Sequence, residues 1–95
     1  MRMFLKVSME TQAGSRAIAD GSMAAAIKGF VDTFKPEGVW FTALDGKRAM
    51  VSVFDLPSAA QLPAMAEPFF SALGAHLEIS PAMDLADLQS GLASV

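Results

Sequence analysis

Few side chains in this sequence could carry acid–base chemistry, and the only histidine is the first candidate. His76 lies in an alternating stretch typical of a strand, and an imidazole with an ordinary pKa of about 6.5 exchanges a proton at neutral pH. His76 is therefore either a general acid or base, or an interface residue that makes one hydrogen bond. With one histidine and no cysteine, we expect no transition-metal site.

Three further ionisable residues could take part in a site. Glu67 precedes Pro68, which disfavours helical geometry at the residue before it, so its carboxylate is either aimed into a cavity or solvated at a helix break. Lys6 and Glu78 lie on strands that we expect to pair. They form either a cross-strand ion pair or, if a dimer buries them, a binding site for a ligand carboxylate or enolate.

Arg48 and Trp40 complete the set of candidate binding residues. Arg48 follows a tight turn and points either to solvent or to the rim of a cavity, where its guanidinium would stabilise an anion. Trp40 is predicted to anchor an interface, because it buries a large area and its N–H needs one partner. The sequence Asp20-Gly21-Ser22 is either an ordinary helix cap or an anion site made by exposed amides.

Composition limits the classes of function. Ten acidic and seven basic residues give a formal net charge of −3, and no Lys/Arg run exceeds two residues, which argues against nucleic-acid binding. No apolar stretch reaches the roughly 18–20 residues of a membrane span, and no signal peptide is visible, so we expect a cytoplasmic protein with no membrane partner. No nucleotide loop or nucleophile elbow is present, and no cofactor is expected.

The elements that position these side chains follow from periodicity. Residues 3–9 alternate and predict a strand, whereas residues 23–34 have apolar side chains at helical spacing and predict an amphipathic helix. Lys35-Pro36 should end this helix. Residues 11–21 are out of phase with it, and we interpret them as a structured loop with at most one helical turn.

A hairpin is predicted next. Residues 39–44 and 47–54 are apolar runs joined by Asp45-Gly46, a strong type I′ signal because both turn residues need positive φ.

A second helix should begin at Ser58, which opens a capping box, and should end at Gly74. Its course is predicted to be irregular, with a restart at Pro63 and a kink at Pro68.

The last elements are a strand over residues 75–80 and a terminal helix capped by Asp84. The resulting order, βαββαβ plus a final helix, predicts one α+β domain over residues 1–95 with a ferredoxin-like, four-stranded antiparallel sheet. Both main helices should cover one face of this sheet.

The pleat of the sheet sorts the strand residues onto two faces. The face expected beneath the helices collects Leu5, Val7, Met9, Val39, Phe41, Val51, Val53, Leu77 and Ile79. The other face, called the open face below, collects Phe4, Lys6, Ser8, Trp40, Thr42, Arg48, Met50, Ser52, Phe54, His76 and Glu78. Monomers rarely leave such a large apolar patch uncovered, so we expect a homodimer or higher homo-oligomer through this face, with its polar members lining a cavity.

Four segments carry a resemblance to a known family: residues 13–21 (AGSRAIADG), 35–37 (KPE), 62–70 (LPAMAEPFF) and 81–85 (PAMDL). With them the chain resembles a family of small uncharacterised bacterial proteins in the dimeric α+β barrel group, which includes muconolactone isomerase and heme-free monooxygenases. It differs at Ser15, where that family usually has Asn, and at Trp40, where Tyr is common. The resemblance implies the ferredoxin-like fold and adds little about chemistry.

Two functions are consistent with these features. The first is a small-molecule-binding protein with a pocket on the open face inside a dimer, lined by Lys6, Trp40, His76 and Glu78 with Glu67 or Arg48 at the rim. The alternative is a cofactor-independent isomerase or monooxygenase-type enzyme that uses His76 or Glu67 as its acid or base.

Overall fold

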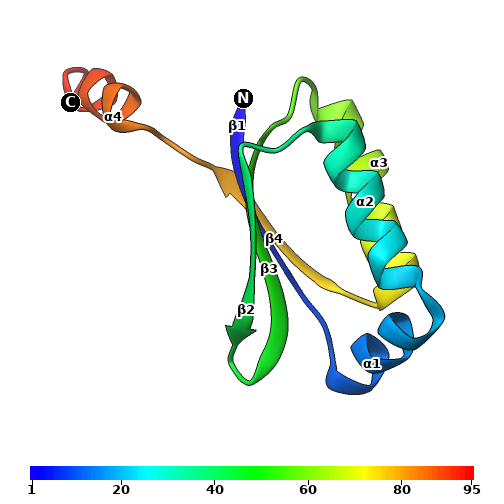
Figure 1. Ribbon diagram of the computed structural model, residues 1–95. Coiled ribbons are helices and arrows are strands. Elements are labelled where there is room, and N and C mark those ends of the chain that lie inside the picture. Colours follow the sequence, from blue (N-terminus) through cyan, green and yellow to red (C-terminus); the bar gives the residue numbers. More distant parts are fainter.

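A four-stranded antiparallel sheet forms the centre of the computed structural model, which describes all of residues 1–95 (Figure 1). The strand order is β2-β3-β1-β4. Helices α2 and α3 cover one face, and α4 lies apart from the sheet on its other side. The elements in chain order are β1 (Arg2–Ser8), α1 (Thr11–Asp20), α2 (Ser22–Phe34), β2 (Gly38–Leu44), β3 (Lys47–Asp55), the 3₁₀ turn η1 (Ala59–Gln61), α3 (Leu62–Leu73), β4 (His76–Pro81) and α4 (Leu85–Leu92).

The connections of this sheet are two helical crossovers and one hairpin. The segment from β1 through α1 and α2 enters β2 on the far side of β3, and α3 likewise carries the chain from β3 past β1 to β4. The first crossover therefore passes over β3, and the second passes over β1. The predicted α+β class and the four antiparallel strands are confirmed.

The hairpin is also confirmed. Asp45 and Gly46 have φ angles of 54° and 74°, the left-handed values that a two-residue type I′ turn requires. Leu44 and Lys47 pair directly beside the turn, which sets the register of the whole β2–β3 ladder.

This register corrects our assignment of β3 to the two faces. Phe41 lies opposite Met50 and Val39 opposite Ser52, and residues directly opposite share a face. Because the turn has two residues, every odd-numbered residue of β2 lies opposite an even-numbered residue of β3. Our assignment of β3, made from hydrophobicity alone, placed odd-numbered residues on the same face in both strands and therefore exchanged the two faces of β3. On β3, the side chains on the helix-covered face are Arg48, Met50, Ser52 and Phe54, and those on the open face are Lys47, Ala49, Val51, Val53 and Asp55.

Aromatic side chains build the core between the sheet and the two covering helices. Phe54 of β3 is fully buried, and its ring meets that of Phe30 on α2 edge-on at 5.4 Å between centroids. Phe30 in turn meets Phe69 of α3 at 5.8 Å. The buried hydroxyl of Ser52 donates a hydrogen bond of 2.8 Å to the Gly38 carbonyl, so this polar group is satisfied inside the core.

Residues 11–20 form helix α1, so the prediction of a loop was wrong. Gly21, at φ 82°, ends α1 and precedes the first residue of α2. Because α1 and α2 are separate helices, the apolar residues of α1 do not have to continue the helical periodicity of α2. Each buries its own residues, Gly14 and Ala17 in α1 and Ala26 and Phe30 in α2.

The predicted restart at Pro63 is confirmed, because the short turn η1 ends at Gln61 and Pro63 lies in the first two positions of α3. The predicted kink at Pro68 does not interrupt α3, which continues from Leu62 to Leu73. Met65, Phe69 and Leu73 form a buried stripe at spacings of four residues, and this packing supports a continuous helix through Pro68. Pro68 lies on the exposed side, where water can satisfy the carbonyl that its ring deprives of a donor. The predicted helix end is confirmed by Gly74, at φ 56°.

Helix α4 begins as predicted, with a capping box between Asp84 and Asp87. None of the helices is long and apolar enough to cross a membrane.

Candidate functional site

A cavity of about 200 Å³ lies between the sheet and helices α2 and α3, at the end of the sheet where β1 leads into α1. Nine of its eleven lining residues are hydrophobic. Three of these are the methionines Met9, Met23 and Met50, whose flexible side chains adapt to ligands of different shapes. Phe41, an exposed residue of edge strand β2, lines the cavity beside Thr42. The cavity is therefore an apolar space with access to solvent.

Arg48 is the only charged residue that lines this cavity, and it is exposed to solvent at the cavity mouth. Its Nη1 donates to the backbone carbonyl of Thr11 at 3.1 Å, and its Nη2 donates to Ser15 Oγ at 3.2 Å. A guanidinium has five N–H donors, so these two bonds orient it while three donors stay available for a ligand. A carboxylate is the natural partner for such a planar fork.

Gly14 lets α1 approach Arg48 closely. A Cβ placed on this buried glycine would lie 2.9 Å from Arg48 Nη1 and 3.1 Å from Met9 Cγ. The motif of residues 13–21 thus supplies both the hydroxyl that orients Arg48 and the glycine that gives it room. Sequence reasoning missed this role for Gly14 and Ser15, although the distinctive motif was the signal that could have indicated it.

Apart from Arg48, the predicted binding residues do not line this cavity. Lys6 and Glu78 lie opposite each other on the open face, with their Nζ and Oε2 atoms 3.9 Å apart. This is the expected cross-strand ion pair, but its atoms are beyond hydrogen-bond distance. Lys6 is half-buried and Glu78 is exposed. An exposed ion pair of this kind stabilises a fold little.

His76 lies at one end of the open face, in a cluster with Glu10 and Lys47. Glu10 Oε1 accepts a hydrogen bond from Lys47 Nζ at 2.9 Å and lies 3.4 Å from His76 Nε2. The ammonium of Lys47, followed by His76, lowers the pKa of the Glu10 carboxyl. All three residues belong to a surface network, and none lines the cavity.

Trp40 is on the open face as predicted, and more than half of its surface is exposed. Its ring lies over Gly38, where a Cβ would overlap the ring atoms. Glycine at position 38 therefore allows the indole to lie flat along β2.

Glu67 is remote from both places. It lines a shallow depression formed only by residues of α2 and α3, together with Pro68 and Ser71. His76 and Glu67 of one chain consequently do not face a common space.

The sequence Asp20-Gly21-Ser22 forms a helix cap in this structure. Asp20 Oδ1 accepts a hydrogen bond from the Ser22 N–H at 2.9 Å, and hydrogen bonding to Ser22 lowers the pKa of the Asp20 carboxyl. The protein's own carboxylate thus takes an amide that we considered for an external anion.

No three His, Asp or Glu side chains are grouped so that they could hold a metal ion. Comparison with protein-family models and with curated proteins finds no match for this chain.

Proposed function

We propose that this protein binds a small amphipathic acid, with the apolar part of the ligand in the cavity and its carboxylate on Arg48. The observation that carries this proposal is one oriented guanidinium at the mouth of an otherwise apolar space. An apolar cavity of about 150 Å³ binds benzene, so a cavity of about 200 Å³ has room for one ring with a short substituent. Benzoate and phenylacetate are the simplest ligands of this class.

Binding is favoured over catalysis at this cavity because its lining contains no carboxylate or imidazole. A general base must come within about 2.6–3.2 Å of the proton it removes, directly or through one water. His76 and Glu67 lie elsewhere on the chain, so the isomerase or monooxygenase alternative requires another copy to bring one of them to a ligand.

For the architecture, we propose the ferredoxin-like fold and a homodimer of the dimeric α+β barrel type, joined through the open faces. The ferredoxin-like fold is supported by the two crossovers, since each passes over one strand as in a split βαβ arrangement. The homodimer is supported by Trp40 and Phe4, which are exposed on the open face. Lys6, His76 and Glu78 would then be enclosed between two copies, and a second ligand site there stays a prediction.

Calorimetric titration of benzoate and phenylacetate, each beside its neutral amide, tests the binding proposal. The acids should bind and the amides should bind at least tenfold more weakly, since a hydrogen bond to a charged group contributes about 1.5–3 kcal/mol. Arg48→Gln should remove this preference, whereas Arg48→Lys should keep part of it.

Lys6→Gln is the matched control, because it removes a cation from the open face. If Lys6→Gln abolishes binding and Arg48→Gln does not, the ligand site is on the open face and our assignment to the cavity is wrong.

A further inference from the structure

Helix α4 exposes a complete apolar stripe. Met83, just before the helix, and three leucines on it are between 41% and 69% exposed, and α4 has no buried residue. Isolated helices shorter than about 12–15 residues are marginal in water, because helices depend on packing of an apolar face. An eight-residue helix with nothing packed against it needs a partner surface. The stripe consists of Met83, Leu85, Leu88 and Leu92.

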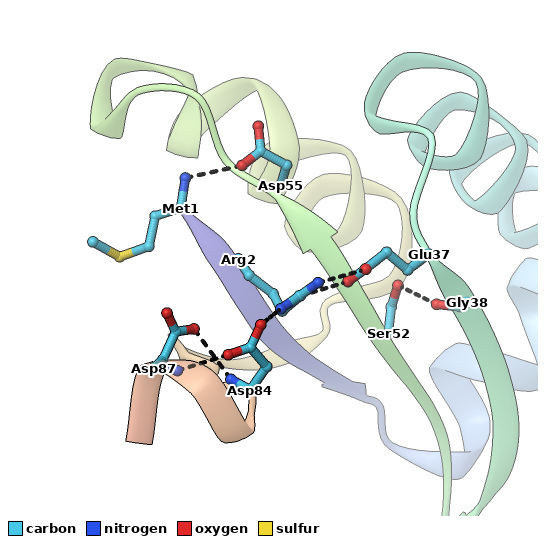
Figure 2. A network of polar contacts seen from close by, with 8 residues as sticks. All are labelled: Met1, Arg2, Glu37, Gly38, Ser52, Asp55, Asp84 and Asp87. Atoms are coloured by element: carbon cyan, nitrogen blue, oxygen red, sulfur yellow. Dashed lines mark hydrogen bonds and ion pairs between the residues drawn. The ribbon is translucent and has the colours of Figure 1, made fainter. Parts of the chain in front are cut away.

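Polar contacts hold the start of α4 against the sheet (Figure 2). Arg2 donates two hydrogen bonds to Glu37, at 2.8 and 2.9 Å, and its Nη1 lies 3.3 Å from Asp84 Oδ2. The capping box between Asp84 and Asp87 then fixes the first turn of the helix. The Arg2 guanidinium contributes to lowering the pKa of the Asp84 carboxyl, after the backbone N–H of Asp87. The arm formed by residues 82–95 is therefore anchored at its base and directed away from its own sheet.

The arm lies on the same side as the open face. Figure 1 shows α4 across the sheet from α2 and α3. The open face presents Trp40 at 57% and Phe4 at 40% exposure. One chain thus has two unpartnered apolar surfaces on one side, and its own geometry keeps them apart.

A stable dimer needs apolar area from both the open face and the arm. Full burial of an aromatic side chain covers about 150–250 Å², so Trp40 and Phe4 of two facing sheets provide only about 400 Å². Specific interfaces bury roughly 1,200–2,000 Å², of which rather more than half, about 700–1,100 Å², is apolar. At about 100 Å² of apolar surface per full side chain, the exposed parts of the four stripe residues on two arms add about 470 Å². Sheet aromatics and arms together therefore reach the apolar area of a stable interface, whereas the sheet aromatics alone fall short.

We propose that the arm of each copy packs its leucine stripe onto a second copy of this chain and clasps the two sheets together. This inference rests on the sheet-to-sheet dimer proposed above, and it adds the element that holds that dimer. A two-fold axis makes the contact reciprocal, so both stripes and both open faces are covered at once.

Analytical ultracentrifugation of the full chain tests the clasp. The wild type should be a dimer at micromolar concentration, and Leu88→Asp and Leu92→Asp should each raise the dimer dissociation constant at least tenfold. Both variants should stay folded, with a circular dichroism spectrum that loses at most the contribution of the eight-residue α4, because α4 has no buried residue in its own chain. Ile18→Asp is the matched control, since it makes a similar change at an exposed position on α1 and should leave the dimer intact.

The outcomes separate the arm from the sheet. If Trp40→Asp dissociates the dimer and neither arm variant does, the open-face dimer stands and the clasp is refuted. If no variant dissociates the dimer, or if the wild type is a monomer with its arm folded onto its own sheet, both are refuted. Loss of benzoate binding in Arg48→Gln is independent of all these results.

The absence of cysteine allows a direct second test. Leu92→Cys carrying a photo-crosslinker, mixed with uniformly ¹⁵N-labelled wild type, should give cross-links between unlabelled and labelled peptides. Cross-links within unlabelled chains alone would overturn the proposal.

Discussion

Replacing Gly14 with alanine should separate the two roles of α1, as a helix and as the support of Arg48. Alanine in place of glycine inside a helix normally stabilises it by about 1 kcal/mol. At position 14 the new methyl group would lie 2.9 Å from Arg48 Nη1, which can move away only by giving up its bonds to Thr11 and Ser15, and 3.1 Å from Met9 Cγ. The lost hydrogen bonds and the crowding of Met9 together should cost about 1–3 kcal/mol. The net change in the free energy of unfolding should therefore be a loss of about 0–2 kcal/mol.

Gly29 is the matched comparison, because it lies within α2 and a Cβ there would meet no atom within 4 Å. Gly29→Ala should gain the full helix propensity, about 1 kcal/mol, which raises the melting temperature of a domain of this size by about 4–8 °C. Thermal unfolding followed by circular dichroism measures both variants. Gly14→Ala should melt at or below the wild-type temperature.

Ligand titration supplies the second readout for this pair. Because the methyl group displaces the guanidinium, Gly14→Ala should weaken benzoate binding severalfold, while Gly29→Ala should leave it unchanged. If Gly14→Ala is as stabilising as Gly29→Ala and binds benzoate normally, then α1 does not constrain Arg48 and the reasoning about the cavity mouth fails.

Two further predictions concern the sheet and the base of the arm. Ser52→Ala should lower the free energy of unfolding by about 1 kcal/mol in urea titrations, because it removes a buried hydrogen bond to the Gly38 carbonyl, and no loss would mean that the bond contributes nothing. The guanidinium of Arg2 lowers the pKa of the Glu37 carboxyl in the folded chain, so the stabilisation from this pair is present above the ordinary Glu pKa and is lost as the pH falls through the folded value. Urea titrations at a series of acidic pH values should show this loss, and Arg2→Gln should flatten it; an unchanged slope in the variant would contradict the assignment.

Local chemistry was sufficient to predict several features of the chain from its sequence. A type I′ turn needs two residues with positive φ, and Asp45-Gly46 provides them. Gly74 ends α3 and Asp84 begins α4 for equally local reasons, since each acts on backbone groups within a few residues. The pairing of Lys6 with Glu78 also followed from the predicted strand order.

Other features depended on contacts between segments far apart in the chain. Pro68 alone predicts a break, but α3 continues through it because Met65, Phe69 and Leu73 are buried in the core. Residues 11–20 have a helical periodicity of their own, but its phase is set by the packing of Gly14 and Ala17 and differs from that of α2, so comparison with α2 did not reveal the helix. Arg48 was a candidate from its residue type, but the hairpin register places it on the helix-covered face.

The candidate site shows this division most clearly. The sequence by itself determined which side chains are charged, which stretches alternate and where the turns fall, because these depend on neighbouring residues. Only the tertiary structure decided that Arg48, Gly14 and Ser15 meet at the mouth of an apolar cavity, and that His76 and Glu67 lie away from it. The physical reason is that a site is a property of packing: its residues come from β3 and α1, and only the folded sheet and helices bring them within hydrogen-bond distance.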